Sequence, residues 1–159
     1  MTIVQRAVAP LRMMLVLTFG ALVVFQTFSL PGQFAHLAEE EPDLAYLRWP
    51  MTAVSAAAIL CVQIVIVCTW KLLTMVQEDR IFTEDALRWV DVIVGAIAAA
   101  WVLVAGTFVY VGLRADDPGL PLLLLLLLLG GGALGLLLLV MKALLQQATT
   151  LRTDMDAVI

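Results

Sequence analysis

The residues of this chain that could perform chemistry are few, and their spacing matches no catalytic arrangement. The only histidine, His36, is followed by Glu39 and Glu40 at three and four positions. On a helix these three side chains would share one face and offer an imidazole and two carboxylates to a metal ion. The same run of acids is also typical of a solvated turn, which is the interpretation we favour. We therefore expect no metal site.

The two cysteines, Cys61 and Cys68, lie seven positions apart and fall on nearly the same face of one helix. At that separation they cannot form a disulfide with each other, so we interpret them as small apolar packing residues rather than a redox pair. The chain has no nucleophile–base spacing and no glycine-rich phosphate loop. We therefore expect no enzyme, no catalytic residue and no cofactor.

The composition is that of an integral membrane protein. Of the 159 residues, 63% are hydrophobic and 14% are charged, whereas about half of a soluble protein is apolar. Four stretches contain no charge, at 13–29, 51–70, 92–113 and 120–141. Each is close to the roughly 20 residues that a helix needs to cross a bilayer. The sequence therefore predicts an all-α, polytopic fold: a single domain, a four-helix bundle with four transmembrane helices.

The boundaries follow from where charges and turn-forming residues resume. We expect spans at about 11–30, 51–73, 90–113 and 120–145, an outer loop at 31–50, a cytoplasmic loop at 74–89 and a cytoplasmic tail at 146–159. Within the outer loop, apolar residues recur at helical spacing, which predicts short helices lying on the membrane surface.

Basic residues are distributed unequally between the two sides of these spans. One side holds seven of them: Arg6, Arg12, Lys71, Arg80, Arg88, Lys142 and Arg152. The other side holds only Arg48 and Arg114. The positive-inside rule then predicts a cell-membrane protein with both termini in the cytoplasm. Neither side has the basic excess needed to bind nucleic acid directly.

Two features within the spans bear on packing. Asp91 lies near the cytoplasmic start of the third span, with Lys71, Arg88 and Lys142 at similar depth. We favour an interfacial ion pair here over a functional intramembrane carboxylate. Polar Gln26 and Gln63 suit hydrogen bonds between helices.

Glycines interrupt the leucine-rich fourth span. Gly131 and Gly135 form a G-x-x-x-G pattern, which lets two helix backbones approach closely. We favour packing within the chain over contact between copies in a homo-oligomer.

The cytoplasmic loop and the tail are the best places for a partner to dock. Thr83, after Phe82 and before two acidic residues, is typical of a helix N-cap. In the tail, apolar residues step by four and three to form a stripe on a polar helix: Leu144, Leu151, Met155 and Val158. With Phe82, this stripe is our candidate docking surface. Its occupant is the chain's own loop helix, which we slightly favour, a second copy, or a soluble protein.

Two segments carry a resemblance to a known family. The segment at 81–93 (IFTEDALRWVDVI) and the closing segment at 143–159 (ALLQQATTLRTDMDAVI) resemble the bacterial four-helix membrane family catalogued as domain of unknown function 2975. The resemblance implies a bacterial inner-membrane protein with no catalytic residues to carry over. Members are often encoded beside small helix-turn-helix regulators, which implies a protein that holds or senses for a transcription factor.

We therefore expect a non-enzymatic regulatory or adaptor protein of the membrane whose cytoplasmic loop and tail dock a partner, such as a helix-turn-helix regulator. One alternative is an immunity, resistance or small-molecule-binding protein that uses the acidic outer hairpin. Another alternative is a transporter subunit.

Overall fold

Helices make up almost all of residues 3–114 and 116–158, the parts of the chain that the computed structural model describes. In chain order they are α1 (Ile3–Val24), a π-helical turn η1 (Phe25–Ser29), α2 (Leu30–Glu40), a 3-10 helix η2 (Pro42–Leu47), α3 (Arg48–Gln77), α4 (Glu84–Gly112) and α5 (Gly119–Val158). Four continuous helical stretches are long and apolar enough to cross a membrane: Arg6–Glu40, Ala45–Gln77, Glu84–Gly112 and Gly119–Val158. The all-α class and the four long apolar helices predicted from the sequence are confirmed.

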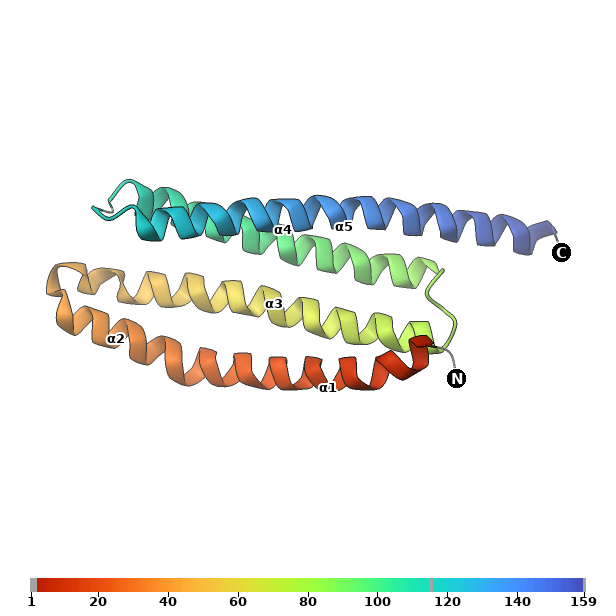
Figure 1. The fold of residues 1–159 in the computed structure, drawn as a ribbon, viewed down its shortest axis with the longest axis horizontal. Coiled ribbons are helices and arrows are strands. Elements are labelled where there is room, and N and C mark those ends of the chain that lie inside the picture. Colours follow the sequence, from red (N-terminus) through yellow and green to blue (C-terminus); the bar gives the residue numbers. More distant parts are fainter. Residues whose placement is uncertain (1–2, 115, 159) are drawn as a thin grey trace.

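The long helices lie side by side in one open layer, whereas the predicted four-helix bundle would be expected to pack them around a shared core (Figure 1). Among the described residues, α3 packs against α1 and α2 on one side and α4 on the other, and α4 packs against α5. α1 and α5 therefore form opposite edges of the layer. A closed bundle is not required, because lipid covers apolar faces as well as another helix does.

The two ends of the layer differ in what they carry. The N-terminus, the C-terminus and the α3–α4 loop all lie at one end (Figure 1). We call this the loop end, and its loop covers residues 78–83. The opposite end holds the turns that join α2 to α3 and α4 to α5.

The first long helix differs from the expected span and outer loop. It continues through η1 and α2 as far as Glu40, so α2 extends the span instead of forming a separate surface helix. The π turn explains how the helix passes Pro31. The N–H of Leu30 bonds to the carbonyl of Phe25, five residues back, immediately before the proline. This wider register accommodates a residue that has no N–H to give.

Few side chains are buried by the protein itself. The buried apolar residues are Val8, Leu30, Ile66, Cys68, Met75, Ala86, Ile93 and Ala96. Most of them belong to α3 and α4, which make the most extensive contact in the layer. Cys61 and Cys68 are both free thiols within α3, and Cys68 is buried, as expected for packing residues.

Candidate functional site at the loop end

The α3–α4 loop is fastened to the far part of α5 by one arginine. Arg152 Nη2 lies 3.3 Å from Asp79 Oδ2, and its guanidinium stands over the Phe82 ring, 5.6 Å from the ring centroid. Asp79 has a φ of 55°, a left-handed conformation that aspartate tolerates better than most residues. No pattern in the sequence indicates this contact, because Arg152 lies off the apolar stripe and 73 positions from Asp79.

Thr83 ends the loop and begins α4, as predicted. Its backbone is extended, and its hydroxyl accepts a hydrogen bond from the Ala86 N–H at 3.4 Å. Glu84 and Asp85 occupy the first turn, where the positive end of the helix dipole stabilises carboxylates. Ala86 is fully buried, so this capped turn is packed as well as capped. It fixes Phe82 next to α5.

The apolar stripe of the tail is left uncovered by the described chain. The exposed fractions of Leu144, Leu151, Met155 and Val158 are 54%, 64%, 68% and 87%. The polar residues Lys142 and Thr149 face α4 instead, Lys142 through Asp91 and Thr149 as a buried side chain. Helical spacing puts the stripe on the other side of α5. The loop thus contacts the tail through Arg152, and the expected docking of the loop onto the stripe is not observed.

Asp91 has one partner among the three cations predicted for it. Lys142 Nζ contacts Asp91 Oδ1, joining α4 to α5. Arg88 lies instead 3.8 Å from Asp85, three residues earlier on its own helix. Lys71 lines a cavity with Arg80 and Arg88. The geometry therefore agrees with an interfacial ion pair.

A tryptophan of α4 packs against the glycines of α5. Trp101 Nε1 donates a hydrogen bond to the Leu128 carbonyl at 2.9 Å. A Cβ added to Gly131 would lie 3.3 Å from Trp101 Cδ1, and one added to Gly135 would lie 4.0 Å from Ile97 Cγ2. Both glycines thus face α4, which supports packing within the chain.

Polar side chains join the first long helix to α3. Arg12 Nη2 donates to Thr74 Oγ1 at 2.9 Å, and Gln26 Nε2 donates to the Ala56 carbonyl at 3.2 Å. The hydrogen bond predicted for Gln26 is therefore confirmed. Gln63 is buried in α3, but its Nε2 has no hydrogen-bond partner within the described residues, so the bond expected there is not formed by that atom.

At the opposite end, one arginine joins two tyrosines. Arg114 Nη1 donates to the hydroxyls of Tyr46 at 2.7 Å and Tyr110 at 2.6 Å. The hydrogen bond to Tyr46 raises the pKa of Arg114, which stays protonated.

The histidine lies on α2 at this same end. His36 Nε2 lies 3.3 Å from Glu40 Oε1. In residues 3–114 and 116–158, no three His, Cys, Asp or Glu side chains converge as a metal site would require.

A cavity of about 390 Å³ opens beside the Arg114 cluster. Its walls are mainly apolar and come from α2, α3, α4 and the start of α5. Glu41, Arg48 and Arg114 contribute the charged groups.

Comparison with known proteins places the chain in one family. The model of the family described as Protein of unknown function (DUF2975) matches residues 32–159. No curated protein and no solved structure matches the chain. The matched region includes both segments whose residues resembled this family and covers all of α3, α4 and α5. The chain therefore belongs to the DUF2975 family.

Proposed function

We propose that this protein is a non-enzymatic membrane adaptor whose tail holds a soluble regulatory protein at the cytoplasmic surface. One observation carries the proposal: α5 continues beyond Lys142 as a helix whose apolar stripe stays exposed while its own loop is fastened elsewhere, at Arg152. Exposed apolar stripes on a polar helix mark protein interfaces. The excess of basic residues at the loop end supports a cytoplasmic location for the tail.

The charges beside the stripe indicate the chemistry of the partner. Asp154 and Asp156 are exposed in the same turns as Met155, whereas Arg152 is engaged by Asp79. A complementary partner therefore presents an amphipathic helix with apolar residues bordered by Lys or Arg. A helix-turn-helix regulator, the partner class that the family resemblance implies, is rich in such basic surface.

The test substitutes Leu151→Asp and Met155→Asp together, with a photocrosslinking residue in place of Leu144 to report on the stripe. We expect the variant to remain folded in the membrane and to lose the crosslink to a soluble regulator. The matched control, Thr150→Asp with Ala157→Asp, adds the same two charges to exposed positions of the same helix off the stripe and should keep the crosslink. The stripe packs on the protein itself if two results occur together. The double variant loses thermal stability, and the protein that carries only the crosslinking residue forms no crosslink. If neither quantity changes, the tail is not a docking surface.

A second function, binding of an apolar small molecule at the opposite end, is favoured by the cavity beside Arg114. Phe34, Leu37 and Met51 line it together with Arg48, so it suits an apolar molecule with an anionic group. An aminonaphthalene sulfonate dye should bind there and fluoresce. Leu37→Trp, which fills the cavity, should lower that fluorescence, and equal fluorescence of the two proteins would exclude this site.

A further inference from the structure

One face of α3 forms the floor of a groove between α1 and α4. Leu60, Ile64, Val67 and Lys71 recur at spacings of four, three and four residues, so they share one side of the helix. The three apolar residues are 51%, 39% and 48% exposed. The open layer explains this exposure, since α5 packs on α4 and does not reach across to α3.

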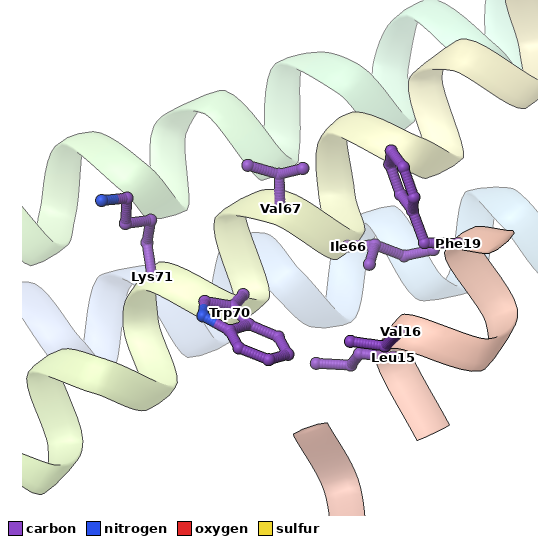
Figure 2. A pocket seen from close by; sticks show the side chains of 7 residues that line it. All are labelled: Leu15, Val16, Phe19, Ile66, Val67, Trp70 and Lys71. Atoms are coloured by element: carbon purple, nitrogen blue, oxygen red, sulfur yellow. The ribbon is translucent and has the colours of Figure 1, made fainter. Parts of the chain in front are cut away.

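Two apolar furrows run along this floor. The first, of about 290 Å³, lies between α1 and α3, and its walls include Leu15, Val16, Phe19, Ile66 and Trp70. Figure 2 shows Trp70 extending toward α1, while Val67 and Lys71, one turn apart, leave α3 on the same side. The second furrow, of about 320 Å³, lies between α3 and α4 and includes Leu60, Ile64, Cys68, Trp89 and Val92. The two furrows share Phe19 and Val67, so they lie side by side.

Both furrows end at a basic cavity at the loop end. This cavity, of about 480 Å³, is lined by Lys71, Arg80 and Arg88 together with one carboxylate, Asp85. It shares Lys71 with the first furrow and both Trp89 and Val92 with the second. Three cations therefore line the cavity that adjoins both apolar furrows at the loop end.

The ion pairs made by the two arginines of this cavity are long enough to be exchanged for a ligand. Asp85 lies 3.7 Å from Arg80 and 3.8 Å from Arg88, and Glu78 lies 3.4 Å from Arg80. Charge-assisted hydrogen bonds of good geometry are about 2.7–2.9 Å long. Lys71 has no ion pair within the described residues. A phosphate group can therefore gain contacts here without breaking a strong pair.

We propose that this groove is a specific site for an anionic glycerophospholipid. The phosphate-bearing headgroup lies among Lys71, Arg80 and Arg88, and the two acyl chains occupy the two furrows. Basic pockets between helices at the cytoplasmic surface are suited to anionic headgroups, and Trp89 lies at the helix end, where indole rings favour the membrane interface. A soluble anion would use the cations but leave the furrows, so the apolar walls commit the site to a lipid. This inference does not depend on the proposed function of the tail.

The test measures lipid binding to the full-length protein in a neutral detergent by native mass spectrometry. Phosphatidylglycerol is added in one series and phosphatidylcholine in another, and we expect the anionic lipid to bind more tightly. In Lys71→Gln/Arg88→Gln its affinity should fall by about twenty-five-fold, because each cation near an anionic lipid contributes roughly fivefold. Arg6→Gln removes an exposed charge outside the groove and should leave the affinity within about twofold.

A second variant tests the furrows separately from the charges. Val67→Trp fills the point at which the furrows touch and should reduce phosphatidylglycerol binding while all three cations remain. Both groove variants change exposed side chains, so their melting temperatures without lipid should match the unsubstituted protein, which shows that they are folded. Equal binding of the two lipids would overturn the proposal. So would displacement of bound phosphatidylglycerol by millimolar inorganic phosphate, or a protein that is dimeric and binds no lipid.

Discussion

At the scale of single residues, the Lys142–Asp91 contact shows how this protein manages charge near the membrane. Both helices are otherwise apolar for several turns beyond this pair. A half-buried lysine at such a depth needs a counter-charge or a route to the headgroups. Asp91 supplies the counter-charge and ties α4 to α5 at the same level.

Asp91→Asn should therefore destabilise the protein without changing its biological output qualitatively. We expect a loss of about 1 kcal/mol, because the pair is partly exposed, measured as a lower melting temperature in detergent. Asp156→Asn, an exposed carboxylate of the tail, is the control and should have no effect. A variant that melts normally but loses function would show that Asp91 is a functional group.

Adjacent glycines give a second residue-scale prediction. Gly131→Leu should destabilise the α4–α5 contact by about 1–3 kcal/mol, because the new side chain begins 3.3 Å from Trp101. Gly130→Leu is the matched control, since its Cβ would meet no atom within 4 Å. Thermal unfolding of both variants tests this. Equal melting temperatures would mean that Trp101 does not pack on α5 as described.

At the scale of elements, local signals in the sequence predicted what local physics determines. The start of α4 at Thr83 followed from its own cap and first-turn acids, and the long apolar helices followed from composition. The continuation of the first long helix past Pro31 did not follow from such local signals, because the π turn that allows it depends on backbone register. Nor did the loop contact at Arg152, which joins residues distant in sequence.

The Thr83 cap itself can be tested. Thr83→Ala removes the acceptor for the Ala86 N–H and should cost about 1 kcal/mol of local stability. Hydrogen exchange at Asp85 to Leu87 should become faster, while Thr83→Ser, which keeps the hydroxyl, should restore protection. Unchanged exchange in the alanine variant would mean that the cap does not stabilise this turn.

At the scale of the whole molecule, the open layer was not predictable from the sequence. Apolar periodicity identifies helices that belong in a membrane, but a face that meets lipid and a face that meets protein are similar in composition. Only the residues with special contacts, such as Trp101 on Gly131, reveal which faces pair. Burial within the protein is correspondingly slight. In the most apolar 18-residue segment of each long helix, only 0–17% of the residues are buried by the rest of the protein.

The orientation of the layer is the prediction at this scale. Seven basic residues at the loop end against two at the other should place the loop end in the cytoplasm. A reporter active only in the cytoplasm should work when fused after Ile159 and fail when fused after Asp116. The reverse result would mean that the loop end lies outside the cytoplasm. The tail could then not bind a cytoplasmic protein.

The length of α5 has a consequence for distance. From Lys142 to Val158 the helix rises about 24 Å, at 1.5 Å per residue. Under the proposed function, a protein bound to the last turns would therefore lie away from the lipid headgroups, at the end of a rigid helix rather than a flexible linker. Its separation from the bilayer is set by the number of helical turns after the ion pair, so adding or deleting one turn would move it by about 5 Å and rotate it only slightly.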